Sequence, residues 1–377
     1  MKIACVVGTR PEAIKMAPVI HELKRRAVVD TIVVLTGQHR ELARQALGWF
    51  DISIDHDLDV MQAEQGLCEL SARLFSAFGT LWSDVSPDMA IVQGDTTSAL
   101  VAAMSGFYRH IPIAHVEAGL RTYDVQNPFP EEMNRTQISK IAAVHFAPTE
   151  KSRDNLLGEG VPREDVHITG NTVIDALNHM TTRQKTIPLP LDSRRKLVLV
   201  SIHRRENIGT PLINICGALR ALHETCPDTE FVLPVHPNPN IFGPVRALLS
   251  NLERFHLVEP LEYPVLVALI RRSRFLLTDS GGLQEEGSAC GKPILVLRKE
   301  TERSEIIASG IGKLVGSDRR RIIAEAIRLL NDDGHLFAMA RGGSPFGDGR
   351  AAPRIVDHCL AYLGRADFQP AKRLGFN

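Results

Sequence analysis

The stretch MAIVQGDTT at residues 89–97 runs from an apolar segment directly into a glycine, an aspartate and two threonines. The stretch FLLTDSGG at residues 275–282 repeats this device in the second half of the chain, and a helix-period segment follows each copy. Such turns lie at the carboxyl ends of parallel strands, where open α/β sheets bind ligands. The two stretches together predict one parallel sheet in each half of the chain and a binding site between the two halves.

Apolar runs rich in valine and isoleucine alternate with helix-period segments on both sides of these stretches, which is typical of parallel strands connected by helices. The clearest helical segment carries Leu67, Leu70, Leu74, Phe78 and Leu81 at steps of three and four residues. The expected strands are residues 3–7, 31–35, 89–92, 113–115, 144–146 and 166–168 in the first half, and residues 197–200, 231–233, 255–258, 275–277 and 294–297 in the second.

The alternation stops at residues 181–191, which contain Pro188 and Pro190 and little periodicity. A break of this kind is typical of a hinge or linker. The chain has 377 residues, which is enough for two domains that each bury a core. We therefore expect two doubly wound, Rossmann-like α/β domains that face each other across a cleft, with residues 1–172 in the first and residues 173–360 in the second.

The composition argues against several classes of function. The 44 Lys and Arg residues balance the 44 Asp and Glu residues, so no long-range field draws the protein to nucleic acid or to an anionic membrane. No apolar run approaches the ~20 residues that span a bilayer, and the N-terminus meets charge too early for a signal peptide. The six cysteines are scattered, which predicts buried thiols in a reducing compartment. We expect a cytoplasmic protein whose partner is a small molecule.

Two segments are predicted to bind anions. Residues 8–15 (GTRPEAIK) follow the first strand and open a helix, whose positive N-terminus lies beside Arg10 and Lys15. Residues 280–282 (SGG) open a helix in the second half, where backbone N–H groups can approach phosphate oxygens. The alternatives are an ordinary turn with solvated basic side chains and a plain glycine-rich turn. No GxGxxG follows a strand and no P-loop is present, so nicotinamide and ATP chemistry lose support and we expect no cofactor.

Three carboxylates lie at strand ends or at a helix start in the first half. Asp95 and Glu117 follow shortly after expected strands, and Glu131 lies at the start of a later helix. Carboxylates grouped in this way are what acid/base chemistry requires. Glu131 and Arg135 are four residues apart, so a pair on a helix surface is an alternative, as is a glutamate that only favours the helix start.

Two histidines occupy matching places in the second half. His203 follows the first strand there, within the run HRREN, and His236 follows the next strand. A histidine among arginines can serve phosphate binding or proton transfer, and surface charge is the alternative. The histidines lack the spacing of a zinc site, so we expect no metal.

Six blocks of the sequence together resemble the non-hydrolysing UDP-N-acetylglucosamine 2-epimerases. They are residues 8–12 (GTRPE), 94–97 (GDTT), 115–121 (HVEAGLR), 130–132 (PEE), 203–207 (HRREN) and 279–286 (DSGGLQEE). The resemblance implies two Rossmann-like domains of the glycosyltransferase-B type and a homodimer. It also implies a C-terminal helix that returns to the first domain, so that residues 361–377 would join that domain.

The resemblance implies a reaction and its partners as well. Members of the family convert UDP-GlcNAc reversibly to UDP-ManNAc by eliminating UDP to 2-acetamidoglucal and adding it back, so the implied partners are UDP-N-acetylglucosamine and UDP. The implied acid/base residues are Asp95, Glu117 and Glu131, with no choice of which serves which face of C2. The residues implied to surround the substrate and its diphosphate are Arg10, Lys15, Arg135, His203, Ser280, Gly281 and Gly282, with Glu286 at the ribose and Arg303 at the nucleotide.

The chain departs from the family at three positions. Relatives often carry an aromatic residue near the uracil, where this chain has Leu266. Many bind a second UDP-GlcNAc as an activator through a glutamine and an arginine, and those places hold Glu41 and Glu64 here. Carboxylates facing an anionic ligand predict weakened substrate activation. The residues that still fit the activator pattern are Gln38, Arg204 and His236.

Three rival functions stay open on the sequence alone. A hydrolysing relative would release UDP and ManNAc, because water can add to the same glycal. A glycosyltransferase with the same fold would require an acceptor. A catalytically silent nucleotide-sugar binding protein is disfavoured by the presence of all three carboxylates.

Overall fold

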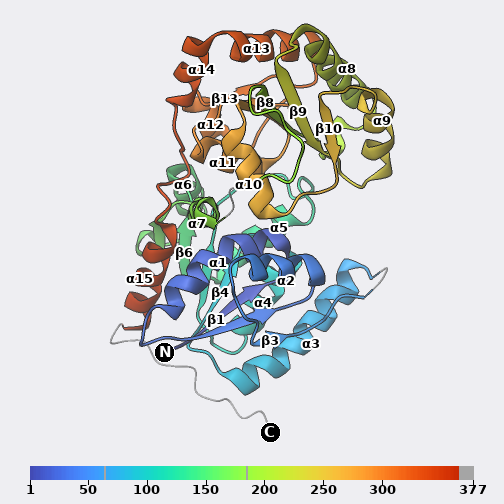
Figure 1. Cartoon of the computed structure of the whole chain (residues 1–377). Coiled ribbons are helices and arrows are strands. Elements are labelled where there is room, and N and C mark those ends of the chain that lie inside the picture. Colours follow the sequence, from blue (N-terminus) through green and yellow to red (C-terminus); the bar gives the residue numbers. More distant parts are fainter. Residues whose placement is uncertain (63–64, 184–185, 365–377) are drawn as a thin grey trace. The chain divides into compact units, whose positions relative to one another are not determined.

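The computed structural model describes residues 1–62, 65–183 and 186–364 and divides the chain into two compact units (Figure 1). Unit 1 comprises residues 1–178 together with the segment that starts at Phe346, and unit 2 comprises residues 179–345. The structure thus places the first division six residues later than the sequence suggested. It places the return to unit 1 at Phe346 rather than at residue 361, and residues 365–377 of that predicted segment lie outside the described residues.

Unit 1 is built on a seven-stranded parallel sheet with the order β3-β2-β1-β4-β5-β6-β7. Its strands are β1 (Lys2–Val7), β2 (Asp30–Leu35), β3 (His56–Asp57), β4 (Met89–Gln93), β5 (Ile113–Val116), β6 (Val144–Ala147) and β7 (Val166–Ile168). Six of them were expected from their apolar runs. The edge strand β3 was missed, because two polar residues carry no apolar pattern.

The helices of unit 1 follow the strands in alternation. They are α1 (Arg10–Lys24), α2 (Arg40–Trp49), α3 (Leu67–Val85), α4 (Thr97–Phe107), α5 (Glu131–Ile141), α6 (Glu150–Gly158) and α15 (Ala351–Leu363), with α7 (Thr172–Arg183) crossing the division between the units and a 3₁₀ turn, η1, at Arg163–Asp165. The apolar stripe of α3 is buried from Leu70 to Leu81 as expected, whereas Leu67 is 41% exposed because it begins the helix.

The C-terminal helix α15 belongs to unit 1, where it lies against α1. Its inner face, which includes Ile355 and Cys359, is fully buried. The side chain of Asp175 accepts hydrogen bonds from the backbone N–H groups of Ala351 (3.1 Å) and Ala352 (2.9 Å). These bonds satisfy two of the N–H groups that a helix start leaves without partners, so they fasten α15 to the unit.

Unit 2 repeats the architecture with a six-stranded parallel sheet of order β10-β9-β8-β11-β12-β13. Its strands are β8 (Lys196–Ser201), β9 (Thr229–Pro234), β10 (Phe255–Val258), β11 (Phe275–Thr278), β12 (Ile294–Val296) and β13 (Gly312–Leu314), the last of which the sequence did not reveal. Its helices are α8 (Thr210–Thr225), α9 (Pro239–Leu249), α10 (Tyr263–Arg272), α11 (Gly281–Ala289), α12 (Ser304–Ala308), α13 (Arg319–Asn331) and α14 (Asp333–Ala340), with a 3₁₀ turn, η2, at Arg205–Asn207.

Each sheet has the strand order of a Rossmann fold, which confirms the prediction of two Rossmann-like domains. The order reverses between β1 and β4 in unit 1 and between β8 and β11 in unit 2, and such reversals create the crevices where open α/β sheets bind ligands. Within the predicted linker at 181–191, α7 continues to Arg183, and residues 186–191 form neither helix nor strand. No helix among the described residues is long and apolar enough to cross a bilayer.

Candidate active site

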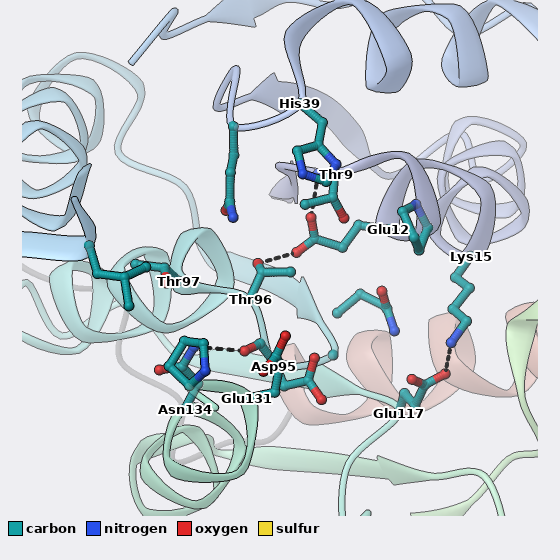
Figure 2. Close-up of a pocket in the computed structure, with 16 residues that line it drawn as sticks. Thr9, Glu12, Lys15, His39, Asp95, Thr96, Thr97, Glu117, Glu131 and Asn134 are labelled. Atoms are coloured by element: carbon teal, nitrogen blue, oxygen red, sulfur yellow. Dashed lines mark hydrogen bonds and ion pairs between the residues drawn. The ribbon is translucent and has the colours of Figure 1, made fainter. Parts of the chain in front are cut away.

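A pocket of about 340 Å³ opens at the crevice of unit 1 (Figure 2). Its walls come from the N-terminal ends of α1, α4 and α5 and from the turns that follow β2, β4 and β5. Asp95, Glu117 and Glu131 all line it, so the structure brings together the three carboxylates that were candidates for acid/base chemistry. Lys15 lines it as well, whereas Arg10 is not among the described residues on its walls.

Glu117 follows β5 and is held from two sides. Its carboxylate pairs with the ammonium group of Lys15 and accepts a hydrogen bond from Nδ2 of Asn171 (2.8 Å). Both members of the ion pair are nearly buried, with 8% of the Glu117 side chain and 12% of the Lys15 side chain exposed. The backbone of Glu117 has a φ of 65°, which non-glycine residues rarely adopt and which persists where the surroundings over-determine it.

Asp95 is held by the first turns of α5. The Arg135 guanidinium pairs with its carboxylate, and Nδ2 of Asn134 donates to its backbone carbonyl (2.8 Å). Arg135 also lies 3.3 Å from a carboxylate oxygen of the buried Glu132. The surface pair between Glu131 and Arg135 that the spacing allowed is therefore not the contact that Arg135 makes in the structure, since its partners are Asp95 and Glu132.

Glu131 presents a different environment from the other two carboxylates. It is the first residue of α5 and lines the pocket. Its Oε2 is buried and has no hydrogen-bond partner among the residues that the structure describes. A buried, unpartnered carboxylate oxygen on a pocket wall is available to a bound molecule.

Glu12 also lines this pocket, although it was not among the site residues predicted from the sequence. It is 3% exposed, and its carboxylate accepts hydrogen bonds from the backbone N–H groups of Gly8 and Thr9 and from the Thr96 hydroxyl. Burial raises the pKa of this carboxyl to about 7, although the hydrogen bonds work in the opposite direction. The spacing Thr9-x-x-Glu12 is that of a capping box, which signals a helix start but not burial.

Arg10 does not line the pocket, and of the activator-pattern residues in unit 1 Gln38 lines it while Glu41 lies at the surface. The Arg10 guanidinium lies over the ring of Trp49, 5.0 Å from its centroid. Gln38 lines the pocket and accepts hydrogen bonds from Ser98, and the side chain of Glu41 is 83% exposed at the start of α2. Glu64 lies outside the described residues.

The glycine-rich turn of unit 2 follows β11, as predicted. Ser280 is the N-cap of α11, and Gly281 and Gly282 form its first turn. A Cβ placed on Gly281 would approach the guanidinium of Arg303 to 3.5 Å, so the turn and this arginine are close neighbours. Nε of Arg303 donates to Oε1 of Glu285 (2.8 Å), and Glu286 is buried one residue further along the helix.

His203 follows β8 and lies against the buried carboxylate of Asp279. The Nδ1 atom of His203 is 3.1 Å from Oδ1 of Asp279, and the same carboxylate accepts hydrogen bonds from the backbone of His203 and Arg204 and from Nδ2 of Asn207 (2.8 Å). Burial opposes ionisation of Asp279, but the bonds from His203 and its neighbours outweigh it, so the pKa of this carboxyl is lowered. The ring of His236 lies 6.2 Å from that of His203.

Arg204 and Leu266, which the sequence analysis named, also lie in unit 2. The Arg204 guanidinium lies 3.3 Å from Glu302, and Leu266 lies in the first half of α10. Across residues 1–62, 65–183 and 186–364, no group of three or more His, Cys, Asp or Glu side chains is placed to hold a metal ion.

The family model for UDP-N-acetylglucosamine 2-epimerase matches residues 21–360. The chain belongs to the UDP-N-acetylglucosamine 2-epimerase family. Its relatives include the UDP-N-acetylglucosamine 2-epimerase of Campylobacter jejuni, which is 44% identical over 369 residues that cover 94% of this chain and 96% of the relative. The family resemblance inferred from the six sequence blocks is thereby confirmed.

Solved structures agree with this assignment to the UDP-N-acetylglucosamine 2-epimerase family. The crystal structure of UDP-GlcNAc 2-epimerase from Neisseria meningitidis bound to UDP-GlcNAc is 42% identical, with a TM-score of 0.89 over 96% of this chain and 100% of that chain. A glycotransferase of kitacinnamycin shares the fold at a TM-score of 0.61 and 12% identity, covering 94% of this chain and 98% of that chain. The fold is thus the two-domain α/β fold that glycosyltransferases also use.

Proposed function

We propose that this protein is a non-hydrolysing UDP-N-acetylglucosamine 2-epimerase, which interconverts UDP-GlcNAc and UDP-ManNAc. The observation that carries the proposal is the group of three carboxylates, Asp95, Glu117 and Glu131, on the walls of one pocket. Inversion at C2 requires a proton acceptor on one face of the carbon and a proton donor on the other. A family member from Neisseria meningitidis binds UDP-GlcNAc in its crystal structure, which supports the same substrate here.

The reaction must make an unreactive proton acidic. The C2–H bond of the sugar is not next to a carbonyl, so its direct removal is very slow. When the C1–O bond breaks, UDP leaves with the bonding electrons and positive charge develops at C1, which acidifies C2–H. A carboxylate then takes the proton, and the C1–C2 double bond of 2-acetamidoglucal forms. Addition of UDP to C1 and of a proton to the opposite face of C2 gives the epimer.

The surroundings of the carboxylates suit these proton transfers. Lys15 and Asn171 fix Glu117, and Arg135 and Asn134 fix the segment that carries Asp95. Prior fixing of the reacting groups avoids the entropic cost of ordering them during the reaction. We include Arg10, Lys15 and Arg135 in the cationic surroundings of the substrate, and the structure adds that Lys15 and Arg135 also hold carboxylates.

The leaving diphosphate is assigned to residues of unit 2. Ser280, Gly281 and Gly282 form the start of α11, where backbone N–H groups and the helix dipole favour a phosphate. Arg303 lies beside this turn, and we assign His203 to the same diphosphate. Donors aimed at a developing charge contribute about 3–4 kcal/mol each. We assign Glu286 to the ribose hydroxyls on the resemblance alone.

The reaction is tested by incubating the protein with UDP-GlcNAc alone in deuterated water and following C2 by NMR. We expect the C2 proton signal to disappear while UDP-ManNAc forms and free UDP stays substoichiometric. Continuous release of UDP with free ManNAc would assign a hydrolysing enzyme, and turnover only with an added acceptor would assign a glycosyltransferase. Inverted product that keeps its original C2 hydrogen would refute elimination.

The assembly is carried over from the resemblance, and the location from the scattered cysteines of the sequence, as part of the same proposal. We propose a homodimer in the cytoplasm. Light scattering of the purified protein tests the dimer, and a mass equal to that of one 41.6 kDa chain would refute it.

A further inference from the structure

The carboxylate of Glu12 makes one contact that its place in the helix does not explain. Its Oε2 accepts hydrogen bonds from the backbone N–H groups of Gly8 and Thr9, which is what a glutamate at the third position of a helix does in a capping box. Its Oε1 accepts a hydrogen bond of 2.7 Å from the hydroxyl of Thr96. Thr96 lies 84 residues away, so this third bond joins two separate helices at the pocket.

Thr96 is the N-cap of α4, and its hydroxyl is engaged on both sides. The oxygen accepts a hydrogen bond from the backbone N–H of Ala99 (3.1 Å), while the hydroxyl proton goes to Glu12. Because the hydroxyl donates one bond and accepts another, the side chain of Thr96 is held in one orientation. The bond therefore fixes the chain at the start of α4, immediately after Asp95.

Asp95 is consequently supported from two directions. On one side, Asn134 and Arg135 of α5 hold its backbone carbonyl and its carboxylate. On the other side, Glu12 of α1 holds the residue that follows it in the chain, through the Thr96 hydroxyl. Loss of the Glu12 bond would remove the support that this segment receives from α1. A displacement of a reacting group by 1 Å can cost about a hundredfold in rate.

We propose that Glu12 is a positioning residue, which acts through the Thr96 hydroxyl to hold Asp95 in place for proton transfer at the pocket. The inference rests on the proposed epimerase function and extends it to a residue that touches neither C1 nor C2. Figure 2 shows the Glu12 carboxylate joined to Thr96 above Asp95, and Asn134 joined to Asp95 from the left.

The protonation state of Glu12 decides the direction of the bond. Ionised Glu12 accepts a hydrogen bond from the Thr96 hydroxyl, whereas protonated Glu12 donates one to the Thr96 oxygen. The Thr96 hydroxyl proton then turns away from Glu12, and the bond loses the negative charge that strengthens it. The charged and titratable groups that share the pocket with it are Lys15 on its own helix, His39 after β2, Asp95 after β4, Glu117 after β5 and Glu131 on α5. The burial of Glu12 raises its pKa to about 7, so the bond is expected to weaken as the pH falls through this value.

The test compares E12Q, T96V and the double variant E12Q/T96V with the wild type. We expect E12Q and T96V each to lower kcat by about 10–100-fold with KM changed by less than threefold, because the reacting group and not the substrate contact is disturbed. The double variant should be no slower than T96V, because T96V already removes the bond to Glu12 together with the cap that Thr96 provides to Ala99. T96S keeps the hydroxyl and should recover most of the rate. E22Q, in the last two turns of the same helix and outside the pocket, is the matched control and should keep the wild-type kcat.

The pH profile separates positioning from a purely structural role. The wild type should lose kcat as the pH falls through about 7, and E12Q should lack this acid limb. An E12Q protein with kcat within twofold of the wild type and an unchanged profile would overturn the inference, as would rate losses that multiply in the double variant. If E12Q does not fold, the comparison of T96V with T96S tests the inference by the same criteria. A wild type without turnover of UDP-GlcNAc would overturn the proposed function instead, and that outcome is seen before any variant is compared.

Discussion

Replacing Asp279 by asparagine tests whether one buried carboxylate organises the segment that follows β8 in unit 2. The side chain is fully buried, and its two oxygens accept from the backbone of His203 and Arg204, from Asn207 and from the His203 ring. In D279N the amide oxygen can replace Oδ2 and keep the bonds from Arg204 and Asn207. The amide nitrogen then faces Nδ1 of the His203 ring, so that contact is lost, whereas the backbone N–H of His203 keeps the oxygen at the Oδ2 place as its acceptor.

The expected cost follows from the lost contact with the His203 ring and from the loss of negative charge on the acceptor of the remaining bonds. Hydrogen bonds to charged groups contribute about 1.5–3 kcal/mol each, and removing one partner of a buried charged network costs about 3–5 kcal/mol. We take about 4 kcal/mol for D279N, which at roughly 2–4 °C per kcal/mol lowers the melting temperature of this unit by about 8–16 °C. The matched control is D228N, because Asp228 is 55% exposed and its pair with Lys196 is worth about 1 kcal/mol at most.

Calorimetry measures the shift, and hydrogen exchange locates it. Both tryptophans, Trp49 and Trp82, lie in unit 1, so tryptophan fluorescence does not report on unit 2. Peptides covering β8 and η2 should exchange faster in D279N, whereas α3 should be unaffected. The pKa of Asp279 is lowered from 3.8, so its contribution is present above that value and is lost as the pH falls through the folded-state pKa. A D279N protein as stable as D228N at pH 7 would refute the reasoning.

Four further outcomes are expected. E131Q should lower kcat by about 10²–10⁴-fold without loss of fold, by NMR assay, with E150Q at another helix start as its control. K15M should destabilise the protein by about 2–4 kcal/mol by leaving Glu117 without its cation, and the double variant K15M/E117Q should recover much of that loss in denaturant titrations. D175A should cost about 2–4 kcal/mol and speed amide exchange in α15, whereas unchanged exchange would contradict the anchoring role. Initial rates in UDP-GlcNAc should be hyperbolic, and clear sigmoidality would contradict the effect expected of Glu41.

The fold could be predicted from the sequence because buried parallel strands are long apolar runs. All eleven expected strands are present, and the turns after β4 and β11 mark the carboxyl edges where the candidate site residues lie. The two strands that were missed, β3 and β13, have two and three residues, and their stability comes from pairing with a neighbour and not from their own composition.

The contacts within the site were less predictable, because they depend on partners far away in the chain. Spacing allowed a pair between Arg135 and Glu131, four residues before it, whereas the partners of Arg135 in the structure are Asp95 and Glu132. The contact between the Arg10 guanidinium and the ring of Trp49 joins two different helices and was not predicted. The burial of Glu12 arises where two helix starts meet, which no local pattern encodes.

The way in which the chain re-enters unit 1 has a consequence for biosynthesis. On the ribosome the N-terminal part of a multidomain protein generally folds first. Here unit 1 needs α15, which ends at Leu363, to cover the face of α1 and to satisfy Asp175. Unit 2 is one continuous stretch that emerges completely before α15 does. Unit 2 can therefore mature first, while the earlier-made part of unit 1 waits with an uncovered apolar face until α15 has been made.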